Sequence, residues 1–138
     1  MTNVSKLNNL NDGLHFLSLG GIGEIGANCY LYGCDGKWIM IDLGLSFADE
    51  KFPGIDLLVP KIDNIESLEN NLEAIIISHG HEDHAGAVAF FANKIKCPVY
   101  ATKFAKLLIE NRLKEFNEVE NFNLLEINLN KKLSSENF

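Results

Sequence analysis

The sequence predicts an α/β protein in which strands and helices alternate along one chain. Residues 73–77 form a β-branched, apolar run, which is typical of a buried strand. Apolar residues then recur at helical spacing at Val88, Phe91, Ala92 and Ile95. This alternation favours a layered α/β domain. The length of 138 residues and the 46% hydrophobic content suit a single domain with its own core.

The expected elements follow from apolar patterning and from turn residues. Residues 1–13 are polar and are expected to be a flexible leader, so that the domain occupies 14–138. The expected strands are 14–19, 28–32, 37–42, 73–77, 98–101 and 123–129, with a turn at 33–36 and a loop at 46–60. The expected helices are 63–72, 84–96 and one that includes 107–116, with its apolar stripe at Ala105, Leu108, Ile109, Leu113 and Phe116.

A glycine-rich segment at 20–26 lies between the first two expected strands. It is superficially similar to phosphate-binding loops, but a dinucleotide fingerprint needs a helix directly after it, and here a strand follows. A nucleotide cofactor is therefore excluded. Two interpretations stay open: a tight turn at the sheet edge, or a loop that lines the mouth of an active site with Gly23, Glu24 and Asn28.

Composition limits the possible partners and the compartment. The net charge of −7 gives no basic footprint for nucleic acid. No apolar run approaches 18 residues and the N-terminus has no hydrophobic signal core, so we expect a cytoplasmic protein without a membrane span. The three cysteines form no C-x-x-C pair and are expected to be reduced.

Three of the four histidines fall inside six residues, directly after the 73–77 strand. Alternate side chains of an extended segment share a side, so His79 and His81 can reach one cation together. Asp83 and His84 can point at a second cation about 3.5 to 4 Å away, as in two-metal hydrolysis. The alternative is an exposed polar loop with ordinary hydrogen bonds. An apolar scaffold that aims imidazoles and a carboxylate at one point favours a borderline cation such as Zn²⁺.

The H-G-H-E-D-H motif at 79–84 resembles the signature of the metallo-beta-lactamase superfamily. Further stretches are similar in order and spacing to the start of ribonuclease J, over about residues 14–128: they are 19–28, 41–45 with Phe47, 52–60, 98–100 and 107–116. The resemblance implies the N-terminal half of an αββα sandwich, a mixed sheet with helices on one face. It also implies a metal-dependent ribonuclease, endonucleolytic and 5′ to 3′ exonucleolytic, that acts on RNA with two Zn²⁺ ions.

The resemblance also implies roles for individual residues. Asp83 would be both a metal ligand and the proton acceptor, and Asp42 would orient the ligands without touching metal. A strand-terminal Asp that caps a turn is the alternative for Asp42. Gly54 and Asp56 lie where some ribonuclease J proteins hold Ca²⁺, although one carboxylate and a carbonyl are too few for such a cation.

The chain departs from the family pattern in what it lacks. After His84 it contains neither a histidine nor an aspartate, whereas the superfamily completes its site with two histidines and a bridging aspartate downstream. The inserted beta-CASP domain that closes over RNA is also missing. Each metal would receive two protein ligands, so we expect poor affinity and little or no activity from this chain in isolation.

Three functions are therefore considered. The first is a ribonuclease J type nuclease represented by its N-terminal portion. The second is another hydrolase of the superfamily, such as a glyoxalase II type thioesterase. The third is a non-enzymatic relic or module that forms a homo-oligomer, or associates with a complementary chain, through the uncovered edge of the half sandwich.

Overall fold

The computed structural model describes residues 13–61, 70–116, 122–134 and 138. The leader at 1–12 and most of the expected 63–72 helix lie outside these ranges. The elements in chain order are β1 (Leu14–Gly20), β2 (Cys29–Cys34), β3 (Lys37–Ile41), β4 (Ser46–Phe47), β5 (Leu57–Leu58), β6 (Leu72–Ile77), α2 (Glu82–Ala85), η2 (Ala89–Phe91), β7 (Val99–Ala101), α3 (Lys103–Glu115) and β8 (Leu124–Glu126).

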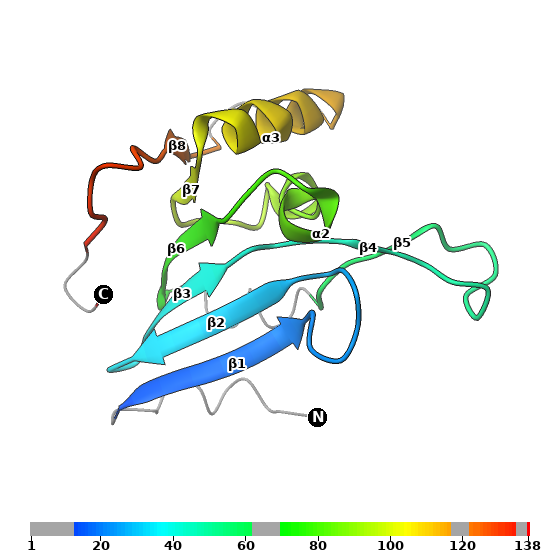
Figure 1. The fold of residues 1–138 in the computed structure, drawn as a ribbon, viewed down its shortest axis with the longest axis horizontal. Coiled ribbons are helices and arrows are strands. Elements are labelled where there is room, and N and C mark those ends of the chain that lie inside the picture. Colours follow the sequence, from blue (N-terminus) through cyan, green and yellow to red (C-terminus); the bar gives the residue numbers. More distant parts are fainter. Residues whose placement is uncertain (1–12, 62–69, 117–121, 135–137) are drawn as a thin grey trace.

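Among the described residues, the main layer is a six-stranded mixed sheet in the order β1-β2-β3-β6-β7-β8 (Figure 1). β1, β2 and β3 are antiparallel neighbours. The pairs β3 with β6, β6 with β7, and β7 with β8 are parallel. The expected α/β class with a mixed sheet is confirmed. Because β3 and β6 are parallel neighbours, the side chains that follow their carboxyl ends lie close together at the same end of the sheet.

One face of the sheet is covered by the helical segments. Alternate residues of β2, β3, β6 and β7 point to this face and form the core with η2 and α3; they include Leu31, Trp38, Met40, Ile75, Ile77 and Val99, each at most 1% exposed. α3 contributes Ala105, Ile109 and Leu113 to the same core. Leu108 and Phe116, which were expected on the buried stripe, are 39% and 40% exposed. The helix stripe is therefore narrower than its sequence predicts.

The opposite face of the sheet is covered incompletely. Ile39, Ile76 and Tyr100 on this face are half-buried, and Phe16 on β1 is 52% exposed. A hollow of about 330 Å³ lies over the face, between these strands and the C-terminal residues Leu133, Ser134 and Phe138. The sheet therefore offers an apolar surface on the side away from α3.

The prediction of one continuous helix at 84–96 is wrong. The structure has a single turn of α-helix at Glu82–Ala85, followed by the 3₁₀ segment η2, which has a turn before it and a turn after it. In a continuous helix the Ala87 N–H would donate to the Asp83 carbonyl. Instead it donates to the Leu43 carbonyl at 3.0 Å, and the Asp83 carbonyl accepts the Asn28 N–H at 3.0 Å. Tertiary hydrogen bonds therefore replace the helical ladder.

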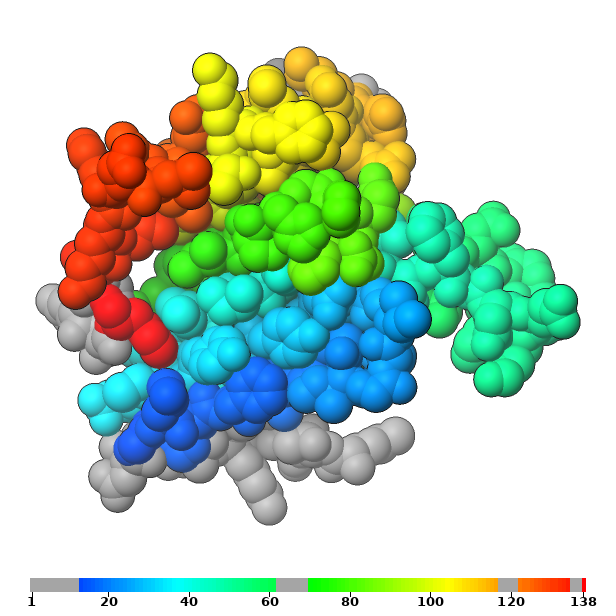
Figure 2. All heavy atoms as spheres, viewed as in Figure 1, coloured from blue at the N-terminus to red at the C-terminus, as the bar shows by residue number. Residues whose placement is uncertain are grey.

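The loop expected at 46–60 contains the short antiparallel pair β4 and β5. Figure 2 shows this segment projecting from the body of the molecule. Phe47 is 74% exposed at its base. Gly54 and Asp56, the residues considered for Ca²⁺, belong to the loop between β4 and β5, and the Asp56 carbonyl accepts the Ala48 N–H at 2.9 Å.

Cys29 lies in the core beneath the candidate site, and burial, with a smaller effect from the Asp42 charge, raises the pKa of its thiol to about 12. The reactive form of cysteine is the thiolate, so we expect iodoacetamide at pH 8 to leave Cys29 unmodified in the folded chain. The half-exposed Cys34 should react first, although the pKa of its thiol is also raised, by desolvation and by Asp35. Peptide mass spectrometry with and without urea checks this. Equal labelling of both cysteines in the folded chain would contradict the packing.

Candidate metal centre

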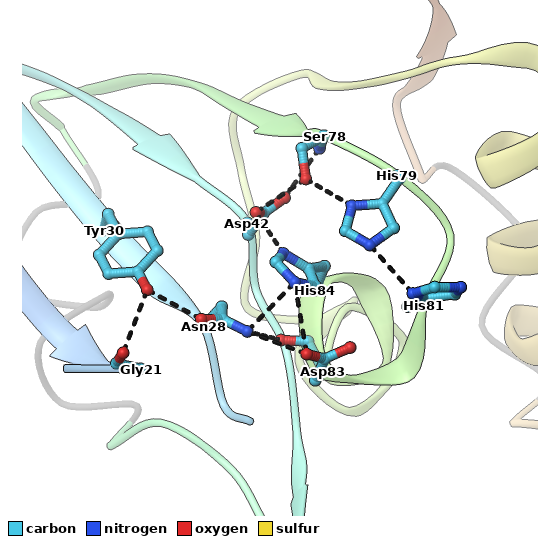
Figure 3. A network of polar contacts seen from close by, with 9 residues as sticks. All are labelled: Gly21, Asn28, Tyr30, Asp42, Ser78, His79, His81, Asp83 and His84. Atoms are coloured by element: carbon cyan, nitrogen blue, oxygen red, sulfur yellow. Dashed lines mark hydrogen bonds and ion pairs between the residues drawn. The ribbon is translucent and has the colours of Figure 1, made fainter. Parts of the chain in front are cut away.

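The four residues of the histidine motif lie at the carboxyl end of β6, beside the carboxyl end of β3 (Figure 3). His79 and His81 belong to the segment that leaves β6, and Asp83 and His84 belong to the single turn α2. His81 is exposed, and the other three side chains are partly buried. The strand end and the helical turn therefore bring the four side chains to one place.

Asp42 lies behind the motif and is 3% exposed. Its Oδ1 accepts the Ser78 N–H at 2.7 Å, and its Oδ2 accepts the Ser78 hydroxyl at 2.9 Å. Oδ2 also lies 2.7 Å from His84 Nδ1. Its backbone φ is 63°, a left-handed conformation that Asp tolerates better than most residues. Asp42 therefore holds Ser78 and the His84 ring in place from behind the motif.

The donors in this network define the histidine tautomers. A carboxylate only accepts, so His84 donates from Nδ1 to Asp42, and in the neutral imidazole Nε2 then carries the lone pair. The Ser78 hydroxyl spends its hydrogen on Asp42, so it accepts the His79 Nδ1–H at 2.9 Å. His79 Nε2 therefore also carries a lone pair. Asp42 thus sets one imidazole directly and the other through Ser78, and both lone pairs face the site.

The candidate ligand atoms form two close pairs. His79 Nε2 lies 3.2 Å from His81 Nδ1, and His84 Nε2 lies 3.3 Å from Asp83 Oδ2. The rings of His79 and His84 are 4.1 Å apart between centroids, so the pairs are adjacent. The four side chains converge and are not splayed apart.

The spacing within each pair suits a shared cation. Zn²⁺ bonds to nitrogen and oxygen are about 2.0 to 2.2 Å long, and in a tetrahedral site two such ligand atoms lie roughly 3.3 to 3.5 Å from each other. The observed separations of 3.2 and 3.3 Å are close to this value. Within the described part of the chain, no group of three or more His, Cys, Asp or Glu side chains is arranged to hold one ion. In the described part of the chain, the candidate ligand atoms therefore come together in pairs.

Backbone contacts hold the motif against the segment that follows β3. Leu43 N–H donates to the His84 carbonyl at 2.8 Å, and Leu45 N–H donates to the Glu82 carbonyl at 3.0 Å. Between them, Gly44 faces the Asp83 backbone so closely that a Cβ there would overlap the Asp83 carbonyl. The turn that carries Asp83 and His84 is therefore positioned by main-chain bonds and by the absence of a side chain at 44.

The glycine-rich segment divides into two parts. Glu24 accepts the Gly21 N–H at 3.1 Å, which is a contact within the loop, and Gly23 is exposed with open space around it. Asn28 instead reaches the motif: its Nδ2 donates to the Asp83 carbonyl at 3.0 Å. Of the three residues considered for this loop, the described contacts bring Asn28 alone to the histidines.

Sequence reasoning missed three residues of the network: Tyr30, Ser78 and Gly44. Tyr30 donates its hydroxyl hydrogen to Asn28 Oδ1 at 2.8 Å. It shares a strand face with Asn28 by the two-residue period, and this was the available signal. The role of Gly44 depends on the approach of α2, for which the sequence carries no signal.

The model of the metallo-beta-lactamase superfamily matches residues 22–132, a range that includes Asp42 and the whole histidine motif. The chain belongs to the metallo-beta-lactamase superfamily. Membership implies a bound metal, in agreement with the paired ligand atoms described above.

The predicted resemblance to ribonuclease J is also confirmed. The chain is 45% identical over 101 residues to ribonuclease J of Sinorhizobium meliloti, a match that covers 70% of this chain and 18% of the relative. It is 33% identical over 116 residues to ribonuclease J2 of Bacillus subtilis, covering 84% of this chain and 21% of the relative. The chain thus spans about a fifth of the length of the curated relatives it matches.

Some solved structures are also similar to the chain. One described as a new diphosphatase from the PhnP family has a TM-score of 0.49 and 18% identity, covering 84% of this chain and 52% of that one.

Within the described residues of this chain, no helix has the length and apolar character needed to cross a membrane.

Proposed function

We propose that this chain is the N-terminal, metal-binding portion of a ribonuclease J type nuclease that hydrolyses RNA in the cytoplasm. The proposal depends on one observation: two pairs of candidate ligands meet at the end of β6. We call these pairs the two ligand couples; the first is His79 with His81, and the second is Asp83 with His84. The similarity to the first fifth of ribonuclease J sequences supports the choice of substrate.

In this proposal the site holds two Zn²⁺ ions. When bound, two such ions lower the pKa of a shared water towards about 7 and stabilise charge that develops on a phosphate. The protein supplies orientation: Asp42 and Ser78 hold the ligand lone pairs of His79 and His84 towards the ions. Asp83 has one carboxylate oxygen on the ligand pair and is partly exposed, so it can also accept a proton.

The negative charge of the chain is consistent with a protein in which other parts attract the RNA. A protein that carries −7 does not attract RNA by itself. The cations, and the remaining four fifths of a ribonuclease J length, would supply the positive potential and the further ligands. Endonucleolytic and 5′ to 3′ exonucleolytic action are proposed on the same resemblance.

Metal content gives the first test. We expect the wild-type chain to bind zinc weakly but measurably, so that gel filtration in zinc-containing buffer, followed by plasma mass spectrometry, shows more metal in the protein fraction than in the buffer. His81→Ala and His84→Ala should each lose one of the two couples, and the double variant should lose all bound zinc, because a single remaining side chain holds the ion weakly. His15→Ala, which changes a histidine outside the motif, is the control. Unchanged zinc content in the double variant would show that the ligands are wrong.

A chimera tests the substrate. The matched segment of the Sinorhizobium meliloti ribonuclease J would be replaced with the corresponding segment of this chain, because 45% identity makes the interfaces compatible. We expect the chimera to cleave RNA with added Zn²⁺ and to lose this activity with His81→Ala. Hydrolysis of a thioester such as S-lactoylglutathione, without RNA cleavage, would favour the glyoxalase II type alternative.

A specific observation keeps the third candidate function, an associating module. The apolar face opposite α3 contains exposed Phe16 and the hollow beside Tyr100, and a second copy or another chain could cover it. This candidate predicts a homo-oligomer and no hydrolysis. Light scattering measures the oligomeric state of the chain. A chain that is monomeric and binds zinc, together with a chimera that cleaves RNA, would exclude the associating module.

A further inference from the structure

Asn28 has a side chain that contacts the atoms of one proposed ligand couple and not those of the other. Its Nδ2 lies 3.2 Å from Asp83 Oδ2 and 3.2 Å from His84 Nε2. These two atoms are 3.3 Å from each other. The three atoms form a nearly equilateral triangle (Figure 3). None of the described hydrogen bonds of Asn28 involves His79 or His81.

The hydrogen-bonding partners decide which way the amide faces. Asp83 Oδ2 and the Asp83 carbonyl only accept, and the tautomer that Asp42 imposes makes His84 Nε2 an acceptor as well. An amide oxygen in this position would face three acceptors without a hydrogen. The NH₂ group must therefore face the couple, and Oδ1 must face Tyr30.

Tyr30 holds the amide in this orientation. Its hydroxyl donates to Asn28 Oδ1 at 2.8 Å and lies 3.4 Å from the Gly21 carbonyl. Asn28 directly precedes β2 and Tyr30 is the second residue of β2, so the paired strand fixes the position of both residues. The Asn28 backbone N–H also donates to the Asp83 carbonyl, which fixes the distance between the strand and α2.

We propose that Asn28, oriented by Tyr30, is a positioning residue that holds Asp83 and His84 at ligand spacing before a cation arrives. The Asn28 NH₂ group has two hydrogens: one is donated to the Asp83 carbonyl, and the other is shared between Asp83 Oδ2 and His84 Nε2, where it offsets the repulsion between their lone pairs at 3.3 Å in the metal-free chain. A bound cation would take the place of this shared hydrogen, and the amide would keep its bond to the Asp83 carbonyl. The inference rests on the proposed metal couples, and it assigns preorganisation of the second couple to a residue outside the motif.

The test follows zinc binding at each couple separately. The imidazole ¹⁵N signals of His79 and His81 report the first couple, and those of His84 report the second. Zn²⁺ titration of the wild-type chain gives an apparent Kd for each. For Asn28→Ala we expect about a 10- to 100-fold weaker Kd at His84, the range for lost partners of metal ligands, with the Kd at His79 and His81 unchanged. The backbone bond from residue 28 to Asp83 remains in this variant.

Tyr30→Phe is the milder variant, since it removes one hydroxyl and keeps the ring that lies against Phe16. It should weaken the His84 couple about 2- to 10-fold, the effect of one neutral hydrogen bond. Tyr32→Phe is the matched control, because it makes the same change two residues along β2, where the ring also contacts Phe16. It should leave both Kd values unchanged.

The outcomes separate this inference from the proposed function. Zinc that binds at His84 equally well in wild type, Asn28→Ala and Tyr30→Phe would overturn the inference and leave the metal centre intact. Equal weakening at both couples would mean a general structural role and would also overturn it. A wild-type chain whose His84 signals do not respond to millimolar zinc would overturn both the inference and the second metal.

Discussion

Asp42→Ala is expected to lower the free energy of unfolding by about 3 kcal/mol or more and to remove zinc from the His84 couple. The variant leaves the Ser78 N–H, the Ser78 hydroxyl and His84 Nδ1 without their acceptor, and an unsatisfied polar group in a partly buried site costs roughly 1 to 3 kcal/mol. The alanine must also adopt φ of 63°, which costs about another 1 kcal/mol. Urea unfolding followed by the fluorescence of Trp38, the sole tryptophan, measures the loss.

Asp42→Asn separates the two effects. It keeps the side-chain size, tolerates the left-handed φ and retains one oxygen for the Ser78 N–H. Its NH₂ group cannot accept from His84 Nδ1, so the imidazole should take the opposite tautomer, with the proton on Nε2, the proposed ligand atom. We expect stability to fall less than in Asp42→Ala, and zinc affinity at His84 to fall about 10- to 100-fold. Wild-type affinity together with an unchanged His84 ¹⁵N spectrum would show that Asp42 does not act through the tautomer.

Gly44→Ala is expected to destabilise the fold by about 3 kcal/mol and to displace the turn that carries Asp83 and His84. The added Cβ would overlap the Asp83 carbonyl, and this backbone cannot rotate away as a flexible side chain could. The neighbouring bonds from Leu43 to His84 and from Leu45 to Glu82 also prevent the two segments from separating without loss. Urea unfolding and zinc titration should therefore both respond.

Gly54→Ala is the control for Gly44→Ala. A Cβ at Gly54 meets nothing within 4 Å, although its φ is +80°, so this variant reports only the cost of a left-handed alanine, about 1 kcal/mol. It should leave zinc binding unchanged. If Gly44→Ala were no more destabilising than Gly54→Ala, the close approach of α2 to the segment after β3 would be wrong.

The sheet and the grouping of the histidine motif could be predicted because their signals are local. Apolar alternation marks β2, β3 and β6, and three histidines within six residues mark the candidate metal ligands. The continuous helix at 84–96 was wrong for a tertiary reason. The apolar spacing of Val88, Phe91 and Ile95 is real, and all three are buried. The helix nevertheless stops, because the carbonyls of Asp83 and His84 accept N–H groups from Asn28 and Leu43.

The sequence by itself determined the fold class, the family resemblance and the set of candidate metal ligands, because strand periodicity and ligand chemistry are properties of neighbouring residues. The tertiary structure decided how these side chains are oriented. The network combines three segments of the chain, which contribute Asp42, Ser78, and Asn28 with Tyr30. The pairing of β2, β3 and β6 brings the ends of these strands together and so assembles the network. A hydrogen bond between residues some 40 to 55 positions apart depends on strand order and register, which no local pattern specifies.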